Sequence, residues 1–112
     1  MGMKWKQKYL STTMAGVPSK PGLYAYGKAR RICGLERSRN IVYVGQTDNL
    51  YRRLNQHLPG AERNSSLREY LRNEDNVLCW YCPLELPKKE IRQLEQQMIE
   101  SIKPKFNTQH NK

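Results

Sequence analysis

The chain has 112 residues, which suit one domain with a single modest hydrophobic core. Lysine and arginine outnumber aspartate and glutamate by 20 to 10, and the formal charge of +10 indicates a polyanionic partner. No apolar run approaches the roughly 20 residues of a membrane span, and no signal-peptide segment is recognisable, so we expect a cytoplasmic protein without a membrane partner.

Two segments of alternating character predict a β-hairpin. In residues 21–27, Tyr24 and Tyr26 share one face; in residues 40–46, Tyr43 lies on one face and Val42 and Val44 on the other. The segment between them holds one acidic residue and several basic ones, and we expect a DNA-binding hairpin loop there, with a basic surface that only aids solubility as the alternative. Its basic residues are Lys28, Arg30, Arg31, Arg37 and Arg39.

Residues 48–58 predict a helix with Asp48 as its N-cap and a Pro-Gly pair after it. Its buried seam repeats leucine every four residues, at Leu50, Leu54 and Leu58. Arg53 and His57 are also four residues apart, so they lie on the same side of the helix, at the edge of the seam.

A second helix is predicted from Asn64 or Ser65 onward, with Leu67, Tyr70 and Leu71 facing inward. Residues 77–82 predict the third strand. Cys79 and Cys82 lie in it with the spacing of some zinc sites, but strand geometry would point their sulfurs to opposite faces. We therefore expect reduced thiols that serve packing.

The last predicted helix covers residues 88–103 and ends before Pro104. Its apolar residues recur at helical spacing and form one stripe: Ile91, Leu94, Met98, Ile99 and Ile102. Glu95 falls inside this stripe, where a carboxylate normally has a partner or binds a metal. Together with Arg53 and His57 it suggests a metal-assisted site acting on phosphate.

Gly22-Leu23-Tyr24 and Tyr43-Val44-Gly45 resemble the two tripeptides of the GIY-YIG nuclease family. Four further residues fall where that family carries an arginine, a histidine or tyrosine, a metal-binding glutamate and an asparagine: Arg53, His57, Glu95 and Asn107. The resemblance implies an α+β fold in which a small three-stranded antiparallel sheet is flanked by helices. It also predicts an N-terminal basic and aromatic extension (1–20), a nuclease domain (21–107) and a C-terminal tail (108–112). The extension is expected to be a docked strand or helix, or a basic arm.

The resemblance further implies a divalent-metal-dependent endonuclease that hydrolyses DNA phosphodiester bonds. Glu95 would bind Mg²⁺ (or Mn²⁺), Tyr24 would activate the attacking water, and Arg53 would stabilise the developing charge. Tyr43 would hold the water or orient the phosphate, and His57 would relay a proton or bind the phosphate. Asn107 and Gln46 would support the site.

The chain departs from the family pattern at two places. The segment between the tripeptides is longer than usual, and Gln46 stands where many members carry a lysine, which leaves one positive charge missing near the phosphate. A catalytically weak or inactive nucleic-acid-binding module is therefore one alternative, and a ribonuclease is another. Specificity is expected from the hairpin loop, the N-terminal segment, oligomerisation or a protein partner.

Overall fold

The computed structural model describes residues 3–9, 16–33, 35–55, 65–74 and 77–110, with the main chain alone at 30–32, 36–39, 55, 65, 68 and 108–110. This part of the chain forms the following elements in order: β1 (Lys6–Tyr9), β2 (Gly22–Ile32), β3 (Leu35–Thr47), α1 (Leu50–Asn55), α2 (Ser65–Asn73), β4 (Leu78–Pro83), α3 (Lys88–Ile102) and α4 (Lys105–His110). Among these residues, no helix combines the length and the apolar character needed to cross a membrane.

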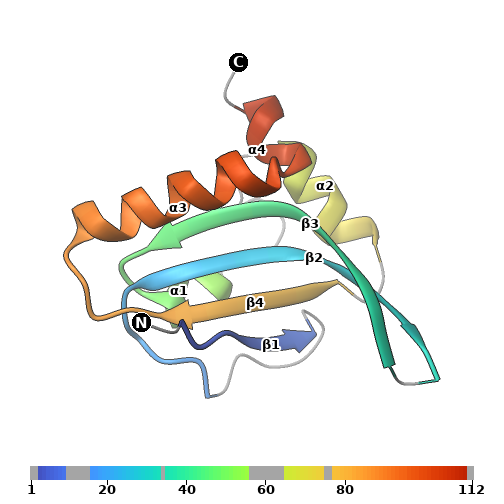
Figure 1. Ribbon diagram of the computed structural model, residues 1–112, viewed down its shortest axis with the longest axis horizontal. Helices are drawn as coiled ribbons and strands as arrows, with labels where there is room; N and C mark the ends of the chain where they lie inside the picture. Colours follow the sequence, from blue (N-terminus) through green and yellow to red (C-terminus); the bar gives the residue numbers. More distant parts are fainter. Residues whose placement is uncertain (1–2, 10–15, 34, 56–64, 75–76, 111–112) are drawn as a thin grey trace.

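The strands form one antiparallel sheet in the order β1-β4-β2-β3, with helices packed on it (Figure 1). The predicted α+β fold is confirmed, but the count of three strands was wrong, because Lys6–Tyr9 pairs with β4 and adds a fourth. The indole N–H of Trp80 donates to Oε1 of Gln7 at 3.0 Å and ties this strand to its neighbour. Three of the four β1 residues are exposed, so β1 lacks the apolar alternation that would have predicted it.

The sheet buries side chains on both faces. On one face, the tyrosines of β2 pack with leucines of the first two helices, and the buried members include Tyr24, Tyr26, Leu50, Leu54 and Leu67. On the other face, α3 packs Met98 and Ile99 against strand residues, which are Ala25, Val44, Leu78 and Trp80. The predicted seam is confirmed at Leu50 and Leu54, whereas Leu58 lies outside the described residues.

A β-bulge changes the predicted side of Val42. The cross-strand pairs Tyr26↔Tyr43 and Gly27↔Ile41 leave Val42 as an extra residue on β3. Val42 is buried in the cluster that holds Tyr26, so the prediction that it shares a face with Val44 was wrong. An inserted residue interrupts the two-residue alternation on which that prediction depended.

The segment between the two tripeptides is a continuous β-ribbon rather than the expected loop. Beyond Gly27, β2 and β3 stay paired as far as Ile32↔Leu35, and in Figure 1 this hairpin extends away from the rest of the sheet. At its tip Cys33 has a positive φ of 52°, as residues in tight hairpin turns do. At its base, Nζ of Lys28 lies 2.7 Å from Oε1 of Glu74, just after α2.

The first helix begins one residue later than expected. Its N-cap is Asn49, whose Oδ1 accepts a hydrogen bond from the Arg52 N–H at 3.0 Å, so the prediction of Asp48 was wrong. Strand β3 continues to Thr47, and the Thr47 hydroxyl accepts from the Asn49 N–H at 3.1 Å, which moves the start of the helix forward. Asp48 instead pairs with the Arg52 side chain.

The predicted end of the last long helix is confirmed, and a further short helix follows it. Lys103 ends α3 in the left-handed conformation, at φ 52° and ψ 58°, and donates its N–H to the carbonyl of Ile99. Pro104 then starts a new turn, and α4 begins at Lys105. Ile102, which was expected in the buried stripe, is 40% exposed because it lies at the last turn of α3.

Candidate active site

The phenol of Tyr24 lies across the main chain of Gly45. The two residues are cross-strand partners in β2 and β3, and the Tyr24 side chain is almost fully buried. A Cβ atom on residue 45 would lie 2.5 Å from both Cζ and the hydroxyl oxygen of Tyr24, which is closer than real Cβ contacts allow. The glycine of the second tripeptide is therefore required by the position of the tyrosine in the first.

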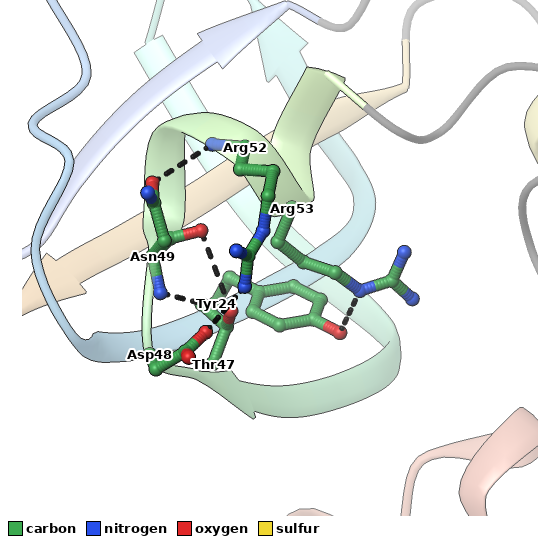
Figure 2. A network of polar contacts seen from close by, with 6 residues as sticks. All are labelled: Tyr24, Thr47, Asp48, Asn49, Arg52 and Arg53. Atoms are coloured by element: carbon green, nitrogen blue, oxygen red, sulfur yellow. Dashed lines mark hydrogen bonds and ion pairs between the residues drawn. The ribbon is translucent and has the colours of Figure 1, made fainter.

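Arg53 holds the hydroxyl of Tyr24 from α1. Its Nε–H donates to the phenol oxygen at 2.9 Å, and its guanidinium carbon lies 5.5 Å from the ring centroid. Figure 2 shows the two Nη atoms extending past the phenol oxygen. Arg53 is half-buried, so a positive charge and several N–H donors lie together next to the Tyr24 hydroxyl.

Tyr43 completes an aromatic group on this face. Its ring centroid lies 6.2 Å from that of Tyr24 and 6.4 Å from that of Tyr26, with the latter pair stacked. Tyr43 is half-buried, whereas the two tyrosines of β2 are buried. Packing of the three rings limits the rotation of each, so the hydroxyl of Tyr24 has a fixed position.

Glu95 approaches the same strand from α3. Burial raises the pKa of its carboxyl group above the usual 4.5, while the nearby Arg92 and a hydrogen bond from the Gln46 main-chain N–H act in the opposite direction. Glu95 is half-buried, and Ile91, one turn earlier on the same helix, is fully buried. The predicted position of this carboxylate on the apolar side of the helix is therefore confirmed. Its partner is a backbone amide, which no side-chain pattern could have indicated.

Asn107 binds the residue that precedes Gly45. Its Oδ1 accepts from the Val44 N–H at 2.8 Å, and its Nδ2 donates to the Val44 carbonyl at 2.9 Å. The Asn107 side chain is 7% exposed. Among the described residues that are buried, Asn107 is the one classed as polar or charged rather than hydrophobic. Helix α4 is therefore fixed to the outer edge of β3.

Three consecutive residues of β3 thus connect the candidate site. Val44 contacts Asn107, Gly45 contacts Tyr24, and Gln46 contacts Glu95. Through Tyr24 this segment also contacts Arg53. We call residues 44–46 the site strand, because it brings side chains from β2, α1, α3 and α4 to one short stretch of main chain.

The remaining predicted residues fall into two groups. His57 lies outside the described residues. Lys28 forms its ion pair with Glu74, while Arg30, Arg31, Arg37 and Arg39 belong to the hairpin ribbon, where the structure gives the main chain. Sequence reasoning missed the main-chain groups of Val44 and Gln46, because only the fold reveals which backbone atoms accept or donate.

The donor atoms at this site suit one hard cation. Within the described ranges, no three histidine, cysteine, aspartate or glutamate side chains come together as a metal site. Mg²⁺ binds through as few as one or two carboxylates and keeps several of its waters, whereas zinc needs three or four protein ligands. Among the described residues at this site the carboxylate is that of Glu95, and one carboxylate is a donor set that suits Mg²⁺ or Mn²⁺. Fold and site together define a small catalytic domain suited to an anionic substrate and one divalent cation.

Comparison with known families and structures agrees with this class. Residues 34–109 match the GIY-YIG catalytic domain, and the chain belongs to this family. It is 34% identical over 93 residues to the UvrABC system protein C of Aquifex aeolicus and 29% identical over 98 residues to that of Mesoplasma florum. These matches cover 83% and 88% of this chain but only 14% and 15% of the relatives.

Solved structures share the fold. The N-terminal GIY-YIG endonuclease domain of UvrC from Thermotoga maritima, bound to its catalytic divalent cation, magnesium, gives a TM-score of 0.58 at 18% identity. The match covers 87% of this chain and 93% of that one. A point mutant of the same domain, also bound to its catalytic divalent cation, gives 0.57. The predicted membership of the GIY-YIG nuclease family is thus confirmed, and the expected class of enzyme with it.

Proposed function

We propose that this domain hydrolyses DNA phosphodiester bonds with the help of Mg²⁺ (or Mn²⁺). The observation that carries the proposal is the convergence of Tyr24, Arg53 and Glu95 on the site strand, each with a different chemical capacity. The basic composition favours a polyanionic substrate. A cytoplasmic location belongs to the same proposal.

Tyr24, in its phenolate form, takes the proton of the attacking water. A phenol loses its own proton only near pH 10 in water, so it needs a cation beside its oxygen to act near neutrality. Arg53 supplies that charge through the hydrogen bond from Nε at 2.9 Å. Because the ring is buried against Gly45, the hydroxyl keeps its direction during the reaction.

Arg53 also stabilises charge on the phosphate. Its planar guanidinium carries donors beyond the one used on Tyr24, and a forked cation matches the oxygens of a phosphate as they gain charge. Tyr43, partly exposed beside Tyr24, orients the water or the phosphate by hydrogen bonding. His57 relays a proton or binds the phosphate.

Glu95 holds the divalent cation. A Mg²⁺ ion held there would supply Lewis-acid stabilisation for the leaving oxygen. The Gln46 N–H orients the carboxylate, and Gln46 therefore contributes its main chain to the site even though it brings no positive charge. Asn107 supports the site by fixing Val44.

Cleavage assays on plasmid, single-stranded DNA and RNA, each with Mg²⁺ or with EDTA, test the proposal. We expect nicking of plasmid DNA in Mg²⁺ and none in EDTA. Glu95→Gln should abolish nicking and keep DNA binding, because the amide cannot neutralise a divalent ion. Glu100→Gln, an exposed glutamate on the same helix, is the matched control and should nick normally.

The alternatives give different results in the same assay. A protein that binds DNA without cleaving any substrate would be a binding module, and cleavage of RNA in preference to DNA would make it a ribonuclease. Parental nicking by Glu95→Gln would refute the assigned metal ligand.

A further inference from the structure

The hairpin ribbon beyond the sheet is the largest feature that the proposed active site does not use. We call residues 28–40 the hairpin arm. Strand β2 pairs with β4 only as far as Gly27↔Leu78 in the described residues, whereas its pairing with β3 continues to Ile32↔Leu35. The arm is therefore two strands wide, and it leaves the body of the protein as Figure 1 shows.

The arm has a fixed base and an exposed tip. At the base, the Lys28–Glu74 ion pair connects it to the end of α2. A second register shift, between the pairs of Arg30 and Arg31, adds another bulge, and bulges increase the twist of a ribbon. At the tip, Cys33 is exposed and Leu35 is 76% exposed. No packing within the described structure accounts for an apolar residue at that tip.

The arm begins directly beside the candidate site. Tyr26 and Tyr43 are cross-strand partners two pairs before its base. At about 3.3 Å per residue, the seven steps along the strand from Tyr26 to Cys33 extend roughly 23 Å. Since DNA rises about 3.4 Å per base pair along one strand, the tip can reach some six or seven base pairs from the site.

The composition of the arm suits a nucleic acid. Besides Lys28, it contains four arginines and one acidic residue, Glu36. A two-stranded ribbon has the width of an α-helix, and the major groove of B-form DNA, about 12 Å wide, admits either element. The major groove of an A-form RNA duplex is deep and narrow, and protein elements do not enter it.

We propose that the hairpin arm lies in the major groove of B-form duplex DNA beside the cleaved phosphate, and that it makes the enzyme select duplex DNA over duplex RNA. This inference rests on the proposed nuclease function and adds the form of the substrate to it. The catalytic residues act on a phosphate in either polymer, so discrimination comes from the shape of the arm.

Binding measurements on three proteins separate the shape of the arm from its charge. In the first variant, residues 29–39 are replaced by Asn-Gly, which joins the partners Lys28 and Asn40 by a two-residue turn. This change removes four arginines and one glutamate. The second variant keeps the arm and loses the same net charge through Arg30→Gln, Arg31→Gln and Arg39→Gln. Each protein is titrated in EDTA with a DNA duplex and with the RNA duplex of the same sequence.

We expect the parent protein to prefer the DNA duplex by about tenfold or more, because only that duplex accepts the arm. The shortened variant should bind both duplexes equally. Its slope of log affinity against log salt for DNA should fall by about 3, at about 0.9 per lost phosphate contact. The charge variant should bind more weakly but still prefer DNA.

Three results would overturn the proposal: a parent without preference, a shortened variant with the parental preference, or a charge variant that loses the preference completely. The last would mean that charge alone selects DNA. Failure of the nuclease function looks different, since the parent would then fail to nick DNA in Mg²⁺. A parent that nicks DNA while the shortened variant keeps the parental preference would refute the role of the arm alone.

A probe on Cys33 tests the arm in a protein that keeps all 112 residues. Cys79 and Cys82 are buried, and burial raises the pKa of Cys79 to about 12, so a thiol reagent labels Cys33. A DNA-cleaving iron chelate attached there, in Glu95→Gln protein, should cut a saturated DNA duplex and leave a saturated RNA duplex largely intact. Equal cutting of both duplexes would refute groove entry. Lys4→Cys with Cys33→Ser moves the chelate to an exposed residue next to β1 and should cut both poorly.

Discussion

One side chain satisfies both main-chain groups of Val44. The amide of Asn107 accepts from the Val44 N–H at 2.8 Å and donates to its carbonyl at 2.9 Å, as a neighbouring strand would. These two groups point away from β2. In the described structure β3 is the outermost strand on this side of the sheet, so no further strand pairs with them. At Val44, a side chain of helix α4 thereby makes the two hydrogen bonds that a fifth strand would make.

Asn107→Ala should lower the stability of the fold more than the chemistry of the folded protein. Two buried main-chain groups lose their partners, and at about 1–3 kcal/mol each the free energy of unfolding should fall by about 2–6 kcal/mol. Urea denaturation measures the loss, and the nicking rate per folded molecule should stay near the parental value. An unchanged stability would show that water replaces the amide at no cost.

Asn107→Asp tests the same bonds one at a time. An oxygen in place of Nδ2 keeps the acceptor for the Val44 N–H but removes the donor to its carbonyl. Protonation of the aspartate at about pH 4 or below restores a donor, so this variant should recover stability in acid relative to the parent. A constant difference between the two proteins across pH would contradict the assignment.

Glu95 should make the metal-free protein less stable at neutral pH. Burial raises its pKa in the folded chain above the usual 4.5. A carboxyl group with a raised pKa in the folded chain gives stability that is full below 4.5 and is lost as pH rises through the folded pKa. In EDTA, Glu95→Gln should therefore melt higher than the parent at pH 7, and this advantage should shrink as pH falls toward the usual value.

Added Mg²⁺ should reverse that order. A cation that binds only the folded state raises its melting temperature, and Glu95→Gln should show no such rise. Glu100→Gln, which changes an exposed glutamate of α3, should respond to Mg²⁺ as the parent does. Equal Mg²⁺ stabilisation of the parent and Glu95→Gln would remove Glu95 from the metal site.

Tyr24→Phe should keep the fold and DNA affinity while lowering the nicking rate by about 10²- to 10⁴-fold, the usual range for lost acid–base assistance. The ring remains to pack on Gly45, so the loss belongs to the hydroxyl. Tyr26→Phe, two residues along the same buried face, is the control. A Tyr24→Phe enzyme with near-parental turnover would transfer the role of base to His57 or to water.

Gly45→Ala should lower the nicking rate to a similar extent, because it displaces the Tyr24 hydroxyl whereas Tyr24→Phe removes it. The new Cβ would lie 2.5 Å from the Tyr24 hydroxyl, so the ring must shift and its hydrogen bond from Arg53 must lengthen. Misplacement of a catalytic group by about 1 Å costs on the order of 10²-fold in rate. If displacement is the cause, adding Gly45→Ala to Tyr24→Phe should cost little more, and additive losses would argue against it.

Much of the fold was predictable because apolar residues recur in the sequence at the spacing of helices and strands. The leucine repeat of α1 and the apolar stripe of α3 are helical signals, and Glu95 stood out as a charge within one of them. Tyr24 and Tyr26 followed strand alternation. Val42 did not, because a bulge leaves no mark in the identities of the residues around it.

The rest of the site depended on contacts that sequence does not encode locally. Asn107 was expected to support the site, but its partner is the backbone of a residue 63 positions earlier. Glu95 likewise meets the main chain of Gln46. Any residue type has an N–H and a carbonyl, so only the path of β3 decides which of these groups take part.

The outer edge of β3 has a consequence for solubility. An edge strand with open N–H and carbonyl groups invites a strand of another molecule to pair with it. Here Asn107 occupies both such groups of Val44, and Glu95 occupies the N–H of Gln46. The residues that build the site therefore also prevent another strand from pairing with β3. Substitutions that remove these side chains should leave the main-chain groups of the edge strand unpaired and make the protein prone to aggregate.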